Sequence, residues 1–354
     1  MSKNELFFQS SDKMTNIHMV TWEPEGEVVG IVQINHGVSE HIGRYEEFAK
    51  FLNSKGLVVV GIDLLGHGMS TNNGSKEMYF GKEGSFKYVV EDIHYALTQT
   101  KNNYPDVPYT MLGLSLGSFL TRAYMIDYPE GVDGAILIGT GYISKFKYKL
   151  ARFVIDRETK KYGDDKATET IRDISFGTYN KKFKPNRTQQ DWLCSNEEAI
   201  DEFLNDDLRG KHVTIGLFRE LINSILYSCD ITNINKMKKD RFIYMLSGGD
   251  DMVSAKGKDL AKMMCIYKDS GINDVEMKLY PGLRHDILHE VEKEQVFKDI
   301  YNWLISKNLA KEIIIESNNE DTSKKKEYDG LVDYDEYDII WPDAMSEHDI
   351  NGNK

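Results

Sequence analysis

Two hydrophobic patterns alternate along most of the chain. Short runs in which most residues are apolar cover residues 28–34, 57–62, 109–112, 134–139, 241–246 and 275–280. Between most of them lie longer stretches whose apolar residues recur every three or four positions. The short runs are typical of strands buried on both faces, and the longer spacing is typical of amphipathic helices. One or two further strands are expected between residue 5 and the first run.

The alternation predicts an α/β fold. The expected helices cover 44–56, 88–102, the residues directly after Ser115, 255–269, and a closing helix around Val296 to Leu304. Strands that alternate with helices form a mainly parallel sheet with helices on both faces. In such sheets ligands bind where the strands end, at their carboxyl edge. Side chains that follow the predicted strands are therefore the first candidates for function.

The pattern changes between residues 142 and 236, which contain helical spacing, many aromatic residues and no convincing strand. We interpret this stretch as a helical cap inserted into the sheet domain. A cap rich in aromatic residues would supply an apolar pocket and exclude water, although most of these aromatics are expected to form the core of the cap itself. The expected organisation is a core of 1–141 and 237–308, a cap of 142–236, and a tail of 309–354.

Charge separates the tail from the rest. From Glu316 onward there are twelve acidic residues and four lysines, which predicts an acidic, disordered tail. The net charge of −13 argues against a nucleic-acid partner. No apolar run is long enough to cross a membrane, and the first residues do not resemble a signal peptide, so the cytoplasm is the expected compartment. The three cysteines, Cys194, Cys229 and Cys265, are expected to be reduced thiols.

The residues Gly113-Leu-Ser-Leu-Gly117 follow the predicted strand at 109–112 and precede helix-compatible residues. Gly-x-Ser-x-Gly between a strand and a helix is the nucleophile-elbow pattern, in which a strained turn exposes the serine hydroxyl. Gly113 and Gly117 fit this turn because larger side chains would collide with neighbouring backbone. The motif predicts that Ser115 is a nucleophile.

A serine hydroxyl needs a base to take its proton, usually a histidine that a carboxylate orients. In elbow-type hydrolases the acid and then the histidine follow the serine along the chain, each in a turn after a strand. His285 fits the position of the base better than His289. Asp250 and Asp251 both fit the position of the acid, and the residues alone do not separate them.

The negative charge that develops on the substrate oxygen needs two backbone N–H groups. One is expected from Leu116, the residue after the nucleophile, and the other from Val38 in the turn after the strand at 28–34. His36 and Gly37 belong to the same turn and are expected to shape the site.

Two other kinds of site have weak sequence support. His285 and His289 have the spacing of a helical zinc motif, but the residue after the first histidine is Asp286 rather than glutamate and no third ligand is evident. The glycines after Asp63 lack the rest of a phosphate-binding loop. We therefore expect neither a metal nor a cofactor.

The chain resembles the monoacylglycerol lipase and bacterial lysophospholipase branch of the α/β-hydrolases, sometimes grouped with serine aminopeptidases. The resemblance covers about residues 5–308. Its motifs are His36-Gly-Val-Ser-Glu-His-Ile-Gly-Arg-Tyr45, Asp63-Leu-Leu-Gly-His-Gly-Met-Ser70, Gly113-Leu-Ser-Leu-Gly-Ser-Phe119, Phe176-Gly-Thr-Tyr-Asn180, Arg187-Thr-Gln-Gln-Asp-Trp192 and Tyr280-Pro-Gly-Leu-Arg-His-Asp-Ile-Leu-His-Glu290. One departure is Leu114, where histidine is common in this branch.

The resemblance implies a serine hydrolase that cleaves fatty-acyl esters of monoacylglycerols or lysophospholipids without a cofactor. The family spacing Gly-x-x-Asp-x-Val, counted from Gly248, places the acid at Asp251. Short-chain esters and peptide N-termini remain alternative substrates; an aminopeptidase would need cap carboxylates such as Asp201, Glu202, Asp206 or Asp207. A non-catalytic binding protein is a third alternative. The sequence leaves open a peripheral membrane contact through the cap, and it does not indicate the oligomeric state.

Overall fold

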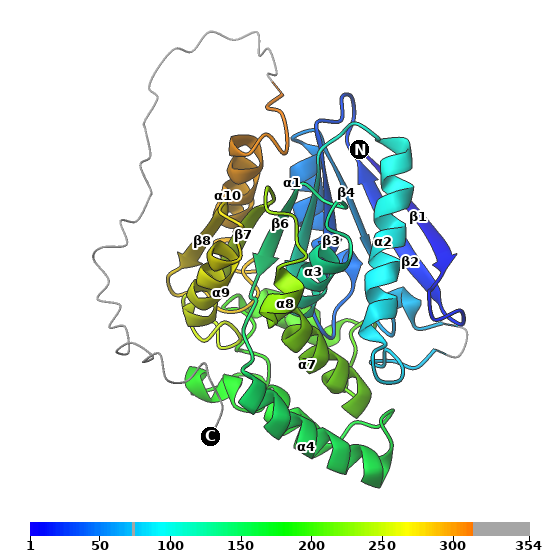
Figure 1. Cartoon of the computed structure of the whole chain (residues 1–354), viewed down its shortest axis with the longest axis vertical. Coiled ribbons are helices and arrows are strands. Elements are labelled where there is room, and N and C mark those ends of the chain that lie inside the picture. Colours follow the sequence, from blue (N-terminus) through cyan, green and yellow to red (C-terminus); the bar gives the residue numbers. More distant parts are fainter. Residues whose placement is uncertain (73–74, 314–354) are drawn as a thin grey trace. The chain divides into compact units, whose positions relative to one another are not determined.

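The computed structural model describes residues 1–72 and 75–313, which include one eight-stranded sheet (Figure 1). The strand order is β1-β2-β4-β3-β5-β6-β7-β8. The six strands from β3 to β8 are parallel to their neighbours in that group, and β1 and β2 are antiparallel. The strands are β1 Ser2–Gln9, β2 Asn16–Glu23, β3 Gly30–Asn35, β4 Leu57–Ile62, β5 Tyr109–Leu114, β6 Gly134–Ile138, β7 Phe242–Gly248 and β8 Val275–Tyr280.

Five helices follow or precede strands within the core: α1 Glu46–Asn53, α2 Phe86–Asn103, α3 Leu116–Asp127, α9 Lys258–Asp269 and α10 Lys293–Ser306. Short 3₁₀ helices occupy η1 Ile42–Tyr45 and η2 Gly68–Ser70. Side chains of a strand alternate between the two faces of a sheet, so each buried strand feeds two separate cores. In β3, Ile31 packs in the core under α2, α3 and α9, while Val32 packs in the core under α1 and α10.

The segment between β6 and β7 is helical, and residues 142–236 contain no strand. Its helices are α4 Lys145–Tyr162, α5 Glu169–Ser175, η3 Tyr179–Phe183, α6 Glu197–Asn205, α7 Ile215–Cys229 and α8 Ile231–Ile234. Five of them begin at a side-chain N-cap, for example Thr214, whose hydroxyl accepts a hydrogen bond from the Leu217 amide. Such caps satisfy amides that have no partner within the helix and fix where each helix starts.

The first compact unit extends from Met1 to Ile313, past the boundary expected at residue 308. Leu309 and Ala310 are buried in the core with α10, and the Leu309 carbonyl lies against Gly30 at the start of β3. The hydrophobic core therefore continues through the first residues of the expected tail, and the remainder of that tail lies outside the described residues. Among residues 1–72 and 75–313, none of the helices combines the length and the apolarity that crossing a bilayer requires.

Candidate active site

Ser115 is the single residue between β5 and α3. Its backbone has φ 52° and ψ −116°, in the region of positive φ that side chains rarely adopt. Such a conformation costs about 1–3 kcal/mol and persists only when the surroundings impose it. The Ser115 amide donates a hydrogen bond to the Ile138 carbonyl at the end of β6 (2.9 Å), which fixes the turn to the neighbouring strand.

The glycines on either side of Ser115 occupy positions with no room for a side chain. A Cβ atom at Gly117 would overlap the Asn35 carbonyl oxygen at the end of β3, and one at Gly113 would lie 2.6 Å from the Thr121 hydroxyl oxygen. The helix α3 therefore starts in direct contact with the strand ends. This close approach is what gives the turn its geometry.

The structure brings Asp251 and His285 together beneath the carboxyl ends of β7 and β8. Oδ1 of Asp251 lies 2.9 Å from Nδ1 of His285, and both side chains are buried. Asp251 also accepts hydrogen bonds from the Val253 amide (2.8 Å) and the Ser247 hydroxyl (2.9 Å). Nε2 of His285 is buried and has no hydrogen-bond partner among the described residues. The ring thus has one nitrogen held by a carboxylate and the other unused.

The adjacent aspartate has a different environment. Asp250 is partly exposed and pairs with Lys182 of η3 (2.5 Å), and Lys256 lies 3.8 Å away. The turn after β7 sends the two neighbouring carboxylates in different directions, one inward to His285 and one outward to the cap. Backbone geometry therefore distinguishes Asp251 from Asp250, which the sequence alone did not.

Burial and charge act in opposite directions on this pair. Burial by itself would raise the pKa of Asp251, but the His285 imidazole and the hydrogen bonds from Val253 and Ser247 outweigh it, so the pKa is lowered. Burial by itself would lower the pKa of His285, but the charge and hydrogen bond of Asp251 raise it above its ordinary value. Asp251 is therefore ionised, and its negative charge favours a positive charge on the His285 ring.

The turn after β3 contributes Gly37 and Val38. His36 is fully buried, lies 2.7 Å from the Gly37 carbonyl through Nδ1, and accepts a hydrogen bond from the Leu64 amide at Nε2 (2.9 Å). Burial lowers the pKa of His36 to about 3, so the ring is neutral and supports the turn by hydrogen bonds alone. A Cβ atom at Gly37 would lie 3.4 Å from the Ser115 Cβ, so this turn contacts the elbow.

Both expected oxyanion donors are available. Neither the Val38 nor the Leu116 amide has a hydrogen-bond acceptor within residues 1–72 and 75–313. Leu116 is the first residue of α3, so its N–H has no partner within the helix, and the helix dipole adds partial positive charge there. Val38 and Ser115 both line the same cavity.

A buried polar network next to the Gly37 turn was missed by sequence reasoning. The Glu40 carboxylate accepts hydrogen bonds from the Gly37 amide, the Tyr45 hydroxyl (2.9 Å) and Arg44. Arg44 also lies 3.4 Å from Asp286, the residue after His285. The Glu-x-x-x-Arg spacing of Glu40 and Arg44 was the sequence feature that could have revealed this network. The network links the turn of Val38 to the turn of His285.

The other candidate histidines have structural partners. His67 is buried, and burial lowers its pKa to about 4, so it is neutral. His289 lies 2.8 Å from Asp286 and 3.1 Å from the Arg44 carbonyl. Residues 285–289 form turns rather than a helix, so the helical spacing considered for a zinc site does not exist there.

None of the four cap carboxylates considered for an aminopeptidase lines the cavity at Ser115. Two of them have partners elsewhere: Asp201 pairs with Arg187 (2.7 Å), and Asp206 lies 2.7 Å from Nε2 of His41. The expected binding site for a substrate ammonium group is therefore not formed by these side chains.

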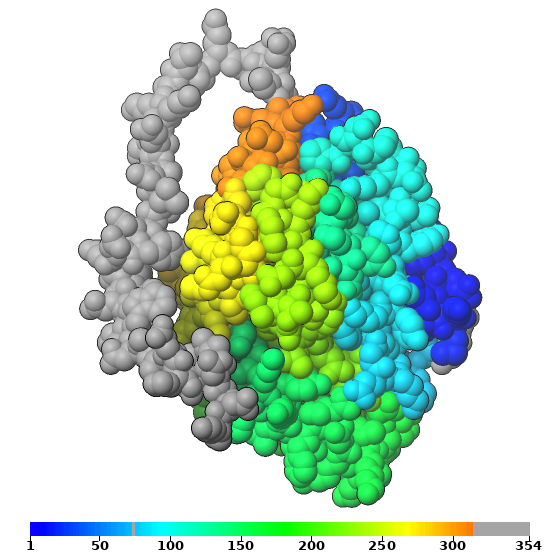
Figure 2. Space-filling view, in the orientation of Figure 1, coloured from blue at the N-terminus to red at the C-terminus, as the bar shows by residue number. Residues whose placement is uncertain are grey.

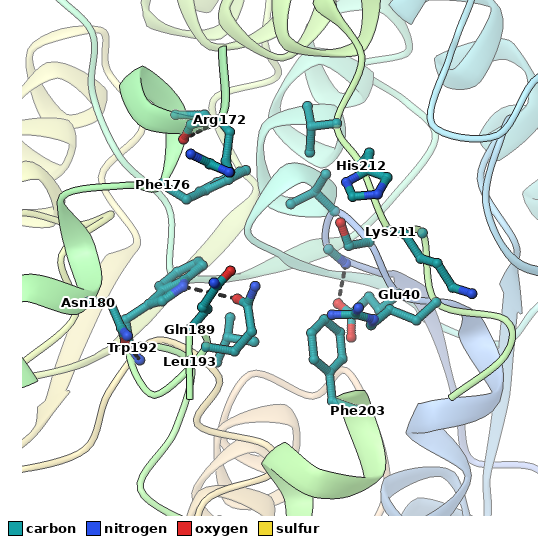
Figure 3. Close-up of a pocket in the computed structure, with 18 of the residues that line it drawn as sticks. Glu40, Arg172, Phe176, Asn180, Gln189, Trp192, Leu193, Phe203, Lys211 and His212 are labelled. Carbon is teal, nitrogen blue, oxygen red and sulfur yellow. Dashed lines mark hydrogen bonds between the residues drawn. The ribbon is translucent and has the colours of Figure 1, made fainter. Parts of the chain in front are cut away.

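A cavity of about 1070 Å³ is lined by Ser115 and His285 at one end and mostly by residues 167–213 elsewhere. Aromatic rings continue from the histidine outward: Trp192 lies 5.2 Å from the His285 ring, and Phe176 stacks on Trp192 at 5.6 Å. Figure 3 shows Phe176 and Trp192 on one side of the hollow and Phe203 on another. The apolar lining residues are Val38, Leu114, Ala167, Phe176, Trp192, Leu193, Phe203, Leu204 and Val213.

Comparisons with known proteins agree with this geometry. A monoacylglycerol lipase of Mycolicibacterium smegmatis is 23% identical over 287 residues, which cover 80% of this chain and 91% of that protein. The phospholipase YtpA of Bacillus subtilis is 24% identical over 283 residues, covering 79% of this chain and 96% of its own. A thermostable carboxyl esterase from Bacillus coagulans, solved with glycerol, superposes with a TM-score of 0.80 at 25% identity over 87% of this chain and 99% of its own.

The family model described as serine aminopeptidase S33 matches residues 26–292, which include both the elbow and the turn of His285. This match spans strands β3 to β8, the helices between β6 and β7, and the cavity. The chain therefore belongs to the serine aminopeptidase S33 family and has the α/β-hydrolase fold.

Proposed function

We propose that this protein is a serine hydrolase that cleaves carboxylic esters of single-chain lipids through an acyl-enzyme on Ser115. The observation that carries the proposal is the convergence of the strained Ser115, the His285–Asp251 pair and two available backbone amides at one end of an apolar cavity. Each of these parts has a separate chemical use in acyl transfer.

In the proposed reaction the Ser115 oxygen attacks the acyl carbon while Nε2 of His285 takes the hydroxyl proton. The Val38 and Leu116 N–H groups stabilise the resulting oxyanion, and Asp251 stabilises the positive imidazole ring. Collapse breaks the ester bond, and the alcohol leaves with the proton from His285. Water then attacks the acyl-enzyme and gives a proton to the same nitrogen. The acyl–oxygen bond breaks, His285 returns that proton to the Ser115 oxygen, and the fatty acid leaves.

The substrate class is inferred from the walls of the cavity. Its aromatic and aliphatic lining suits an acyl chain, and its volume exceeds what a short ester would fill. A monoacylglycerol lipase and a phospholipase among the relatives support the same class. The finer choice between a monoacylglycerol and a lysophospholipid depends on the headgroup.

We also propose that the cap contacts a lipid surface through α4. Phe146, Leu150 and Phe153 are 78%, 60% and 69% exposed, and their spacing places them on one side of the helix. Lysines 145, 147 and 149 are interspersed with them. The helix forms the lower edge of the molecule in Figure 2, coloured green. An exposed apolar face with adjacent cations is typical of helices that lie in a membrane interface.

Fluorophosphonate labelling tests the catalytic proposal. Wild type should be labelled and Ser115→Ala should not, and a panel of monoacylglycerols, lysophospholipids, nitrophenyl esters and aminoacyl amides should show turnover that depends on acyl-chain length. Turnover restricted to short esters or to aminoacyl amides would favour the corresponding alternative substrates. Absence of serine-dependent labelling would leave the non-catalytic binding protein as the better reading.

A further inference from the structure

Phe203 of α6 has an arginine on each of two sides, and the two arginines have different partners. The Arg44 guanidinium lies 4.8 Å from the ring centroid and the Arg209 guanidinium 5.0 Å. Arg44 is neutralised by Glu40 and Asp286. Arg209 forms no ion pair with any described residue, and its Nε is buried without a hydrogen-bond partner. All three of these side chains line the cavity that contains Ser115.

The acidic residues near Arg209 form hydrogen bonds with other groups. Asp206 and Glu77 are close enough to act on the charge of Arg209, but neither pairs with it. The Asp206 carboxylate lies against His41 and accepts the Leu208 amide, and Glu77 accepts the Lys211 amide. Burial lowers the pKa of Arg209, which is the sign of a cation that has lost water without gaining a counterion.

Further side chains that can donate hydrogen bonds line the same cavity as Arg209. Lys211 and His212 follow it in the chain, and Lys181 of η3 also lines the cavity. None of these side chains has an acidic partner among the residues that the structure describes. Figure 3 shows Lys211 and His212 on the side of the hollow opposite Phe176. Arg209 and Lys211 are therefore unpaired cations at the cavity.

The opposing charges at the cavity do not cancel this group. Glu40 and Asp286 are committed to Arg44, and Asp173 pairs with its neighbour Arg172. Among the acidic residues that line the cavity, Glu169 is the one left without a basic partner, and it offsets part of the positive charge of Arg209 and Lys211. The cavity therefore joins an apolar wall to a wall with surplus positive charge.

The segment that carries these cations is firmly attached to the core. A Cβ atom at Gly210 would overlap the Met78 sulfur, and the Thr214 hydroxyl donates a hydrogen bond to the Met78 carbonyl. Backbone contact on both sides of Lys211 and His212 fixes where their side chains start. Donors that start from a fixed backbone bind an anion with less loss of entropy than donors on a mobile loop would.

We propose that Arg209, Lys211 and His212 bind the phosphate of a single-chain phospholipid while its ester lies at Ser115. This inference rests on the proposed function and assigns the headgroup: the preferred substrate is an anionic lysophospholipid rather than a neutral monoacylglycerol. Guanidinium and ammonium groups make charge-assisted hydrogen bonds to phosphate oxygens, which a glycerol hydroxyl cannot match.

The test compares kcat/KM for a short-chain 1-acylglycerol 3-phosphate and the matching 1-acylglycerol, both below their critical micelle concentrations so that no lipid surface is present. Wild type should prefer the phosphate ester by about tenfold or more. Arg209→Gln and Lys211→Gln should each lower this preference by about tenfold, and Arg209→Lys should restore part of it. Lys268→Gln, an exposed charge on α9, should leave the preference unchanged.

A wild-type preference near one, with serine-dependent turnover of the neutral ester, would overturn the headgroup assignment and leave the proposed function standing. An equal loss of preference in Lys268→Gln would overturn it in favour of the general field of the protein. If neither ester is turned over, the proposed function fails, and calorimetry on Ser115→Ala with the alkyl-ether analogues then judges the headgroup alone. Inorganic phosphate that competes as well as the acylated ligand would identify a free-phosphate site instead and overturn the assignment.

Discussion

Oδ1 of Asp251 lies 2.9 Å from Nδ1 of His285, inside a region from which solvent is excluded. The next carboxylate back along the chain, Asp250, faces Lys182 at the surface. One peptide unit thus separates a group that can stabilise an imidazolium from a group that can only attach the cap to the core.

Replacing the two aspartates in turn should separate their roles. Asp251→Asn should lower kcat by about four orders of magnitude, because the amide no longer stabilises the imidazolium or fixes its tautomer. Asp250→Asn should stay within a few-fold of wild type, since it loses one exposed ion pair worth less than about 1 kcal/mol. Steady-state kinetics on a soluble nitrophenyl ester measures both. A large loss in Asp250→Asn with a small one in Asp251→Asn would reverse the assignment.

The pH dependence of turnover should follow His285. The base acts only when neutral, so kcat/KM should rise with pH and level off above the pKa of the ring. Because Asp251 raises that pKa, the midpoint of the rise should lie above the ordinary value of about 6.5. Removing the charge in Asp251→Asn should move the residual midpoint to lower pH. A midpoint that stays in place would mean that another group limits the rate.

Glu40→Gln should slow acyl transfer without unfolding the protein. The carboxylate holds the Gly37 amide, the Tyr45 hydroxyl and Arg44, and its loss would loosen the turn that carries the Val38 N–H. Removal of one oxyanion donor typically costs 10²–10³-fold in kcat, so a misplaced donor should cost about 10-fold to 100-fold. The loss should fall on kcat more than on KM. Glu169→Gln, also at the cavity, serves as the control for removing a charge.

Gly117→Ala should be strongly destabilising. Its methyl group would occupy the position of the Asn35 carbonyl oxygen, and backbone on both sides leaves no room to move. Overpacking of this kind typically costs about 1–3 kcal/mol and should also displace Ser115. Gly249→Ala is the matched control, because its Cβ would lie 3.4 Å from the nearest atoms, an ordinary contact. Chemical denaturation of both variants, together with fluorophosphonate labelling, measures the two effects.

The double change Phe146→Ser and Phe153→Ser should weaken binding to vesicles that contain anionic lipid and slow turnover of lipid presented in them. Turnover of a soluble nitrophenyl ester should be unaffected, because these side chains are exposed. Met14→Ser removes an equally exposed apolar side chain, 79% exposed, in the turn between β1 and β2. If that control lowers vesicle binding as much as the double change does, α4 is not the contact.

The sequence predicted the sheet well because the inner strands are buried on both faces, which leaves an apolar run such as 57–62 with no alternative interpretation. It predicted the order and positions of Ser115 and His285 because a strand followed by a tight turn has a local signature. It could not separate Asp250 from Asp251, since the direction of each side chain depends on the turn and on Lys182, 68 residues away. The contact between Arg44 and Asp286 joins residues 242 positions apart, and no local sequence pattern can indicate it.

The proposed catalytic residues and most of the cavity wall come from different segments of the chain, which matters for laboratory evolution. The proposed nucleophile, base and acid, Ser115, His285 and Asp251, follow strands, whereas most of the cavity wall comes from the single stretch 167–213. A gene library confined to that stretch would vary which molecules are accepted while leaving the reacting atoms in place. Substrate selectivity could therefore be altered separately from the proposed catalytic residues.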